Sequence, residues 1–371
     1  MQRYDVLIVG GGIAGAGIGY ELAGSCSVAI LDMESTLGFH TTGRSAAAFL
    51  ESYGSHTVRL LVSSSRAFFE DPPAGFDRPL LTPRSLLWVV PEDEVHLLEQ
   101  LEHTVREFVA DAEMIDAAEA VKRCPVLNPN WVGKALVEPG ASDIDVNAIH
   151  QGFIRGFRAN GGTIHRSSKV TVMERPGDVW TVSTQSGEVF EAPVVVNAAG
   201  AWGDELARLA GAKPIDLQPM VRNIFTVPRP DLPTGYIFSK LPLVHDVAGR
   251  FYFKPEGDSM LCSPADEVPS EPCDAKPQPE QIARAIEDIN SATTMGLRRV
   301  ETSWAGLRTF APDRVPVFGW DGAVPGLFWC AGQGGFGIQT APAAADLCAA
   351  LLLGQAPALD PAPYLATRRG L

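Results

Sequence analysis

Three apolar stretches of the chain each end in a turn that is rich in glycine. Residues 4–9, Tyr-Asp-Val-Leu-Ile-Val, are apolar and β-branched, which predicts a strand buried on both faces of a parallel sheet. Residues 192–202 and 328–340 repeat the pattern. The first and last stretches are followed by segments rich in Ala, residues 13–23 and a stretch from about Pro342, which are typical of helices. The sequence therefore predicts an α/β fold whose sheet collects strands from the beginning, middle and end of the chain.

The segments between these stretches follow two other patterns. Residues 51–145 are predicted to be mainly helical: residues 92–108 are amphipathic, and residues 112–120 are typical of a capped helix. Residues 217–309 alternate between apolar and polar positions, for instance over 250–254, which predicts an antiparallel sheet. We therefore expect a second, α+β domain that is built on this antiparallel sheet.

Composition and charge narrow the classes of function. The chain has 371 residues, of which 46% are hydrophobic and 20% charged, as in a globular protein with a large core. Its net charge of −14 argues against a nucleic-acid partner, because phosphate binding needs clustered Lys and Arg. No apolar run reaches the roughly 18 residues of a transmembrane helix, and the N-terminal stretch runs into a glycine turn without a cleavage site. We expect a cytoplasmic protein whose six cysteines are reduced thiols, with no metal site because no CxxC pair occurs.

The first glycine turn has the spacing of a dinucleotide-binding loop. Gly10, Gly12 and Gly15 form G-x-G-x-x-G between a predicted strand and a predicted helix. The first glycine allows the tight turn, the second lets a pyrophosphate approach the backbone, and the third lets the helix pack on the strand. The next predicted strand ends at Asp32, whose carboxylate can accept hydrogen bonds from a ribose, with Glu34 as the alternative. This turn alone does not distinguish FAD from NAD.

Three further segments resemble those of a flavoenzyme family. They are Gly38-Phe-His-Thr-Thr-Gly-Arg-Ser-Ala-Ala47, Asn197-Ala-Ala-Gly-Ala-Trp202 and Gly332-Gln-Gly-Gly-Phe-Gly-Ile338. On these residues the chain is identified as a member of the D-amino acid oxidase-like (DAO) FAD-dependent oxidoreductases, with the closest resemblance to bacterial D-amino acid dehydrogenases, including the enzyme that oxidises D-arginine. The resemblance implies a Rossmann-like FAD-binding domain of the glutathione-reductase type and a substrate-binding domain. The first is expected over residues 1–50, 146–216 and 310–371, and the second over residues 51–145 and 217–309.

The resemblance also assigns residues to an FAD that is bound without a covalent link. Arg44 and Ser45 would donate hydrogen bonds to the phosphate and ribitol, and the backbone of Val170 would contact the adenine. The last glycine turn would contact the edge of the flavin ring. The full set expected to contact FAD is Gly10, Gly12, Ile13, Ala14, Gly15, Asp32, Met33, Thr42, Gly43, Arg44, Ser45, Ala47, Val170, Ala199, Gly200, Trp202, Gly306, Gly332, Gln333, Gly334, Gly335, Phe336, Gly337 and Ile338.

Two arginines match the positions at which the family holds a substrate carboxylate, which needs a planar, bidentate cation. The expected catalytic set is Tyr53, Arg222, Tyr252, Arg308 and Gly335. Ala48 and Leu87 are expected in the substrate pocket, and His245 on a surface loop that could cover it. Where the D-arginine enzyme has a His and a Glu, this chain has Ala48 and Leu87. A guanidinium would remain unpaired there, which is costly, so we predict small or apolar substrate side chains.

The predicted reaction is the oxidative deamination of a small-molecule D-amino acid. Hydride transfer from the α-carbon to flavin N5 would give an imino acid and then a 2-oxo acid, and no catalytic base is predicted. The D-configuration follows from the resemblance alone. Alternatives are a glycine or sarcosine-type amine oxidase, a 2-hydroxy acid dehydrogenase, or a biosynthetic-cluster flavoenzyme that acts on a larger amine. A non-catalytic FAD-binding module is the alternative from a different class. Both O2 and a quinone remain open as the electron acceptor.

Overall fold

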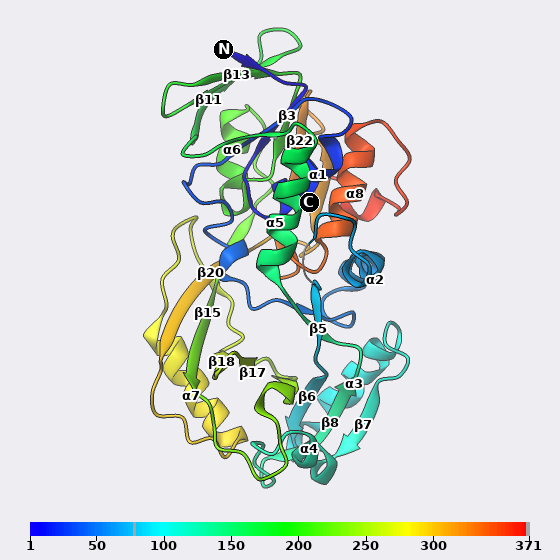
Figure 1. Ribbon diagram of the computed structural model, residues 1–371, viewed down its shortest axis with the longest axis vertical. Helices are drawn as coiled ribbons and strands as arrows, with labels where there is room; N and C mark the ends of the chain where they lie inside the picture. The colour runs from blue at the N-terminus through cyan, green and yellow to red at the C-terminus, as the bar shows by residue number, and fades with distance from the viewer. Residues whose placement is uncertain (77–78, 369–371) are drawn as a thin grey trace.

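The computed structural model describes residues 1–76 and 79–368. The molecule is elongated, with a helix-covered sheet at one end and a second, larger sheet at the other (Figure 1). Within the ranges that the structure describes, no helix combines the length and apolarity needed to cross a bilayer. The same ranges contain no group of three or more His, Cys, Asp or Glu side chains that could hold a metal ion.

The first sheet has six strands in the order β10-β3-β2-β14-β22-β21, all parallel except the last pair. Its strands are β2 (Val6–Val9), β3 (Val28–Leu31), β10 (Thr163–His165), β14 (Val194–Asn197), β21 (Val317–Trp320) and β22 (Leu327–Ala331). Every residue of β2 and β3 is buried, because helices cover one face and a small sheet covers the other. The α/β arrangement confirms the predicted fold class.

Alternate residues of these strands pack in opposite directions. Ile8 and Ile30 pack under the helices α1 (Ile13–Leu22) and α8 (Ala341–Leu352), with α5 (Val146–Ala159) lying beside α1. Leu7 and Ala29 pack under α6 (Gly203–Leu209) and a four-stranded sheet. That sheet consists of β1 (Gln2–Arg3), β11 (Val170–Glu174), β12 (Trp180–Thr184) and β13 (Val189–Ala192).

The second large sheet has ten strands, with the main order β23-β20-β15-β18-β17-β16-β6-β8-β7 and β19 beside β15. Its strands are β6 (Leu86–Pro91), β7 (Glu113–Asp116), β8 (Val132–Glu138), β15 (Gln218–Pro228), β16 (Leu243–Asp246), β17 (Tyr252–Glu256), β18 (Ser259–Ser263), β19 (Val268–Pro269), β20 (Thr302–Phe310) and β23 (Gln333–Gly334). Its neighbours are antiparallel, as predicted, apart from the parallel pair β16 and β6. The helices packed on it are α3 (Val95–Arg106), α4 (Ala117–Arg123) and α7 (Pro279–Ala292).

Two parts of residues 51–145 differ from the prediction. This range is not mainly helical, because it contributes β6, β7 and β8 to the ten-stranded sheet. Residues 113–116 form β7, and helix α4 begins only at Ala117, where the Asp116 side chain accepts a hydrogen bond from the Glu119 N–H. The Asp116 cap thus sets the start of the helix inside the segment that we predicted to be helical throughout.

The remaining elements connect the two large sheets. A three-stranded sheet is formed by β4 (Ala48–Phe49), β5 (Leu81–Pro83) and β9 (Ser142–Ile144). Helix α2 (His56–Glu70) packs against α8, although its residues fall in the range expected for the substrate-binding domain. The division of the chain into two domains therefore stays a proposal, and we place α2 with the FAD-binding part.

Candidate active site

One continuous cavity runs from the ends of β2, β3 and β14 to the ten-stranded sheet. Most residues expected to contact FAD line it, together with Tyr53, Arg222, Tyr252 and Arg308. Those cofactor residues are Gly10, Gly12, Ile13, Ala14, Asp32, Met33, Thr42, Arg44, Ser45, Ala47, Val170, Ala199, Gly200, Trp202, Gly306, Gln333, Gly334, Gly335, Gly337 and Ile338. Gly15, Gly43, Gly332 and Phe336 are not in the cavity wall.

The glycines of the first turn have the roles that their spacing predicts. Gly10 has a φ of 111°, and a Cβ added there would lie 2.2 Å from the carbonyl oxygen of Ala198. A Cβ on Gly15 would lie 1.9 Å from the carbonyl oxygen of Gly10, so only glycine allows α1 to approach this turn. The N-cap of α1 is Gly12, which has no side chain of its own to cap the helix. The N-terminus of α1 therefore faces the cavity as a site suited to a pyrophosphate.

Two side chains from other elements hold this turn in place. Asp32, which follows β3, accepts hydrogen bonds from the Gly11 N–H at 2.6 Å and the Glu34 N–H at 2.8 Å. Burial raises the pKa of the Asp32 carboxyl, although these backbone donors oppose the shift. The Thr42 hydroxyl accepts from the Ile13 N–H at 3.0 Å.

His150 is a functional candidate that the sequence did not single out. It lies on α5 and is 139 positions from the turn, with its Nε2 3.0 Å from the carbonyl oxygen of Gly11. Burial lowers the pKa of His150, which favours the neutral ring. A neutral imidazole that donates to Gly11 stabilises the turn without adding charge beside the pyrophosphate site. No local motif marks His150, because only the packing of α5 against α1 brings it to the turn.

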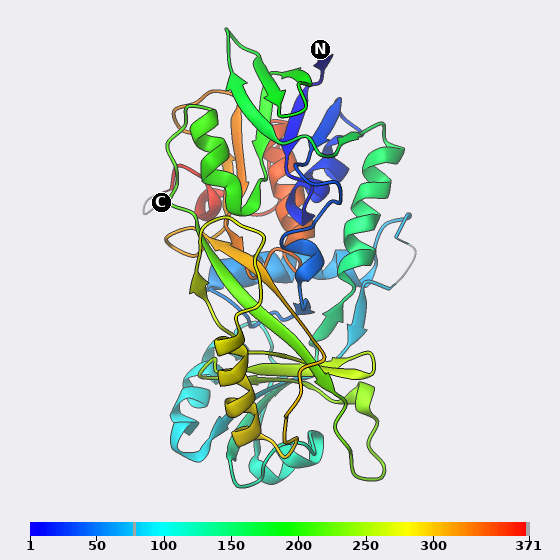
Figure 2. The same ribbon diagram turned by 90° about the vertical axis from the view of Figure 1, so that its left-hand side faces the viewer.

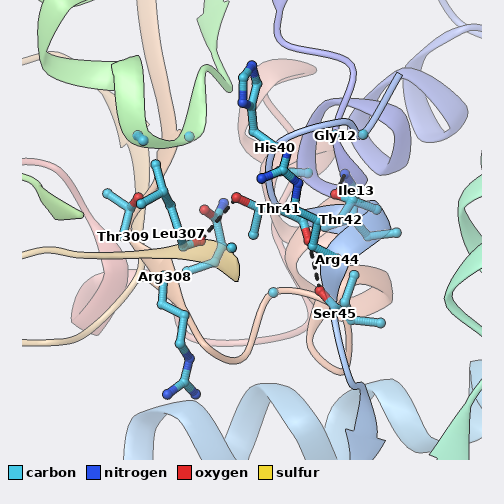
Figure 3. A pocket seen from close by; sticks show the side chains of 18 of the residues that line it. Gly12, Ile13, His40, Thr41, Thr42, Arg44, Ser45, Leu307, Arg308 and Thr309 are labelled. Atoms are coloured by element: carbon cyan, nitrogen blue, oxygen red, sulfur yellow. Dashed lines mark hydrogen bonds between the residues drawn. The ribbon is translucent and has the colours of Figure 1, made fainter. Parts of the chain in front are cut away.

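Arg44 does not have the side-chain role that we expected. We predicted that its guanidinium donates to phosphate, but it donates instead to the carbonyl oxygens of Phe39, Ala275 and Ala305 and to Asp274. It therefore ties the loop over residues 38–47 to β20 and to the loop before α7. Figure 3 shows the same connection from Thr41, whose hydroxyl donates to Leu307 of β20 at 3.0 Å. The sequence resemblance locates this loop correctly, but it does not reveal where the Arg44 side chain points.

The last glycine turn touches the substrate end of the cavity. A Cβ added to Gly335 would lie 1.4 Å from a terminal nitrogen of Arg308, so a glycine is needed for that guanidinium to lie against the backbone. Figure 3 shows the Arg308 side chain pointing away from Thr42 and Arg44. Phe336 stands behind the turn and packs 5.4 Å from the Tyr53 ring, measured between centroids. The turn thus connects the cofactor end of the cavity with the arginine.

Arg222 and Arg308 converge on one carboxylate. They lie on one face of the adjacent strands β15 and β20, since Arg222 pairs with Gly306, two positions before Arg308. The Oε1 atom of Glu267 lies 3.3 Å from Nη1 of Arg308 and 3.9 Å from Nη2 of Arg222. Two guanidinium groups within reach of a single carboxylate oxygen form a clamp suited to a carboxylate ligand. The sequence did not single out Glu267.

Two tyrosines lie beside this arginine clamp. Burial opposes ionisation of Tyr53, but the positive charges of Arg308 and Arg222 prevail and lower the pKa of its hydroxyl. The Tyr252 ring lies 6.0 Å from the guanidinium carbon of Arg222. Both tyrosines line the cavity and can add hydroxyl donors to the clamp.

The register of the ten-stranded sheet corrects the placement of Leu87. Leu87 pairs with Val244, and both point into the core on the far side of the sheet from the cavity. The next pair, Trp88 and His245, has the opposite orientation, and His245 lines the cavity. Because side chains alternate along a strand, Leu87 faces the core and does not line the cavity as we expected. His245 is also not on a surface loop: it lies in β16 with 8% of its surface exposed.

The substrate end of the cavity is positively charged. Arg222, Arg308 and Lys254 line it, whereas the acidic side chains of the described cavity wall are Asp32, Glu34 and Glu205 of the FAD-binding part. Lys254 is ion-paired with Asp143 at 2.8 Å. Ala48 lines the cavity as expected and brings no charge. This end of the cavity therefore favours an anionic group and disfavours a cationic one.

The glycine turn of a dinucleotide-binding site and the arginine clamp share one cavity. This combination is typical of an oxidoreductase that binds a nucleotide cofactor beside a carboxylate ligand. The family of FAD-dependent oxidoreductases (DAO) matches residues 5–351, and the chain belongs to this family. FAD-dependent oxidoreductase domain-containing protein 1 of Bos taurus is 24% identical, over 99% of this chain and 85% of that protein. Mitochondrial dimethylglycine dehydrogenase of Mus musculus is 25% identical over 71% of this chain, which spans only 30% of that protein.

Glycine oxidase of Geobacillus kaustophilus resembles the chain over its full length. The sequences are 25% identical over 99% of this chain and 97% of that protein. A crystal structure of this glycine oxidase has a TM-score of 0.87 at 23% identity and covers 100% of both chains. The fold is therefore that of the DAO flavoproteins, with a Rossmann-like FAD-binding domain.

The residues of the cavity fit FAD. The glycine turn leaves the space that a Cβ would fill, the α1 N-terminus would hold the pyrophosphate, and Asp32 would accept hydrogen bonds from the ribose. Gly334, Gly335 and Gly337 line the cavity where it meets the clamp, and this turn would hold the flavin ring. When bound, FAD supplies an acceptor for a hydride. The protein supplies binding, orientation and charge.

Proposed function

We propose that this protein oxidises the Cα–N bond of a D-amino acid with a small or apolar side chain. The Cα–H bond breaks, its electron pair leaves with the hydrogen as a hydride to FAD, and the imino acid is hydrolysed to a 2-oxo acid and ammonia. The substrate amine must be neutral before the hydride leaves, so its ammonium proton passes to water. Orientation by the clamp is the main contribution of the protein to this step.

The convergence of Arg222 and Arg308 carries this proposal. Their shared contact with Glu267 demonstrates that a carboxylate can reach both guanidinium groups. A substrate carboxylate in the same clamp would place its α-carbon beside Gly335, at the junction with the flavin site. The wall thus provides a carboxylate site next to a hydride acceptor, as an α-amino acid oxidation requires.

The charge of the cavity supports a preference against basic side chains. Arg222, Arg308 and Lys254 bring three cations to this end, and their acidic partners Glu267 and Asp143 are not among the described residues that line the cavity. A D-arginine side chain would add a fourth cation without a partner, which costs several kcal/mol in a buried site. Leu87 does not enter this argument, since it points away from the cavity.

Glycine or sarcosine is the second candidate substrate class. The similarity to glycine oxidase over the full length of the chain favours it, and so does the similarity to dimethylglycine dehydrogenase. Both substrates carry the carboxylate and amine that the clamp would hold. Both lack a side chain, and sarcosine also bears an N-methyl group.

Anaerobic flavin reduction tests both candidates. The purified holoprotein is mixed with D- and L-forms of Ala, Leu, Phe, Met and Arg, and with glycine and sarcosine, while flavin absorbance is followed. We expect bleaching by D-Ala, D-Leu, D-Phe or D-Met at least tenfold faster than by D-Arg; a clear preference for D-Arg contradicts the proposal. Fastest bleaching by glycine or sarcosine selects the second candidate, and no bleaching by any of them refutes both.

A clamp variant tests the assigned residues in the same assay. Arg308→Lys keeps the charge but loses the planar fork, and we expect kcat/KM to fall roughly 10- to 100-fold. Arg298→Lys is the matched control, because Arg298 is exposed and lies outside the cavity. Equal activity of the two variants contradicts the clamp. Turnover with O2 or with a quinone then distinguishes the two electron acceptors, since only O2 gives hydrogen peroxide.

A further inference from the structure

A row of aromatic side chains crosses the ten-stranded sheet beneath the substrate end of the cavity. Trp88 on β6, His245 on β16 and Tyr252 on β17 are successive cross-strand partners. The His245 ring lies 4.6 Å from the Trp88 ring and 5.7 Å from the Tyr252 ring, which is nearly parallel to it. The Tyr53 ring lies 6.0 Å from the same imidazole. His245 is thus held in one position by rings on three sides.

The hydrogen bond at Nδ1 fixes the protonation pattern of His245. Nδ1 lies 2.8 Å from the backbone carbonyl oxygen of Asp246. A carbonyl oxygen only accepts, so Nδ1 must carry the hydrogen and Nε2 keeps a free lone pair. Nε2 makes no hydrogen bond with any residue that the structure describes, and His245 lines the cavity. The imidazole therefore presents an unused acceptor at the cavity wall.

The surroundings of His245 keep it uncharged. Burial lowers its pKa to about 4, and the positive charges of Arg222 and Arg308 act in the same direction, against the Asp246 carbonyl and carboxylate. The Asp246 carboxylate is bound by Arg250 at 2.7 and 2.8 Å, so it does not bond to the imidazole. Near neutral pH, His245 is a neutral hydrogen-bond acceptor.

His245 also lies close to the clamp. Tyr53, on one side of the ring, is next to Arg308, and Tyr252, on the other side, is next to Arg222. The guanidinium groups can only donate hydrogen bonds. A ligand that offers both a carboxylate and an N–H group needs an acceptor for the second group within reach of the clamp.

We propose that Nε2 of His245 accepts a hydrogen bond from the α-amine of the substrate whose carboxylate is held by Arg222 and Arg308. This inference rests on the proposed function, because it requires an amine substrate. A neutral acceptor holds the amine without attracting a further proton into a site that already contains cations. The amine thus stays neutral, and this form allows the hydride to leave the α-carbon. His245 does not store the ammonium proton, which passes to water.

Two variants separate an acceptor role from a structural one. His245→Gln places an amide oxygen near the position of Nε2, and His245→Leu removes the acceptor while filling the space. His96→Leu, at an exposed position of α3, is the matched control. Each holoprotein is titrated with acetate, a carboxylate that has no amine, and is then reduced anaerobically by the best amino acid of the panel.

We expect the Kd of acetate to stay within about twofold of the wild-type value in all three variants. For the amino acid, the ratio of the reduction rate constant to Kd should fall about tenfold or more in His245→Leu, the value of one lost hydrogen bond. His245→Gln should recover most of that loss, and His96→Leu should behave as the wild type.

Unchanged amino-acid reduction in His245→Leu overturns the inference. An equal loss of acetate and amino-acid binding also overturns it, because His245 would then only support the clamp. The same holds if His245→Gln is as impaired as His245→Leu. If no amino acid reduces the wild-type flavin, the proposed function fails, and this inference fails with it. This result can be told apart from a failure of the inference alone, because it is seen in the wild type before any variant is compared.

Discussion

Glu267 offers a test of the clamp that does not depend on the identity of the substrate. Its carboxylate contacts Arg308 at 3.3 Å and Arg222 at 3.9 Å, and it is held in place by Arg314 at 2.8 Å. An incoming carboxylate must therefore share or displace this resident acid. Glu267→Gln removes the negative charge while keeping the size of the side chain, so we expect external carboxylates to bind more tightly.

The size of the gain follows from the distances. Two unit charges about 5 Å apart repel by about 3 kcal/mol at an effective dielectric constant of about 20. The Glu267 side chain is 30% exposed. Solvent screening therefore leaves about half of this repulsion, about 1.5 kcal/mol or roughly tenfold in Kd. A dicarboxylate should gain more than a monocarboxylate, because both of its charges feel the resident acid.

Titration of the flavin absorbance with acetate and with malonate measures the effect. Glu271→Gln is the matched control, because Glu271 is exposed in the same loop and makes no ion pair among the described residues. The gain should shrink at high ionic strength, since the Debye length falls from about 30 Å at 0.01 M to about 3 Å at 1 M salt. Unchanged Kd values for both anions in Glu267→Gln, with FAD still bound, would refute the view that Glu267 competes for the clamp.

Four further changes have defined outcomes. Gly335→Ala forces the Arg308 guanidinium to move, because the new Cβ would lie 1.4 Å from it, and kcat/KM should fall roughly 100-fold with FAD retained; a normal KM would contradict this. Gly15→Ala should lower the flavin content of the purified protein, since its Cβ would lie 1.9 Å from a backbone oxygen of the preceding turn; full FAD occupancy would count against the close packing. Leu87→Ala should lower the free energy of unfolding by about 2–5 kcal/mol, because Leu87 lies in the core. The ratio of D-Leu to D-Arg activity should not change; a changed ratio would indicate that Leu87 contacts the substrate. The pKa of His245 is about 4 in the folded state, below its ordinary value of 6.5. The unfolded chain therefore takes up this proton first as pH falls, and up to about 3 kcal/mol of stability should disappear between pH 6.5 and 4. Urea unfolding across this range should show a smaller loss in His245→Gln than in the wild type.

The cofactor end of the site was predictable because its information is local. Gly10, Gly12 and Gly15 act through the backbone conformation of a single turn, and the strand and helix around them follow from patterns within about 20 residues. The same holds for the turn around Gly335. In each case a backbone feature, and not a long side chain, determines the role of the residue.

Side-chain direction within buried strands was not predictable. Residues 86–90 of β6 are all apolar and all buried, so their sequence does not indicate which alternate set faces the cavity. A polar residue at every second position would have settled the register, but β6 has none before Pro91. The misplacement of Leu87 follows from this lack of alternation.

The residues missed by the sequence reach the site through long-range contacts. His150 meets the first glycine turn only because α5 packs on α1, and Glu267 meets the arginines only because its loop folds back over β15 and β20. Glu138 does not line the cavity, but it depends on long-range contacts in the same way: it is buried in β8 and accepts hydrogen bonds from Ser52 and from the indole of Trp88. Burial raises the pKa of Glu138. Nothing in the residues around these three predicts such partners.

The position of the clamp relative to the flavin site is determined by strand register. Strands β15 and β20 pair continuously from Gln218 with Phe310 to Thr226 with Thr302, and they run side by side into the lower half of the molecule (Figure 2). At its end, β20 pairs with β23, so that Thr309 lies opposite Gly334. Arg308 is therefore one residue from a ladder that includes the glycine turn at the flavin site. Because backbone hydrogen bonds set this spacing, loops elsewhere can vary without moving Arg308, whereas a one-residue bulge in β20 would turn Arg308 out of the cavity.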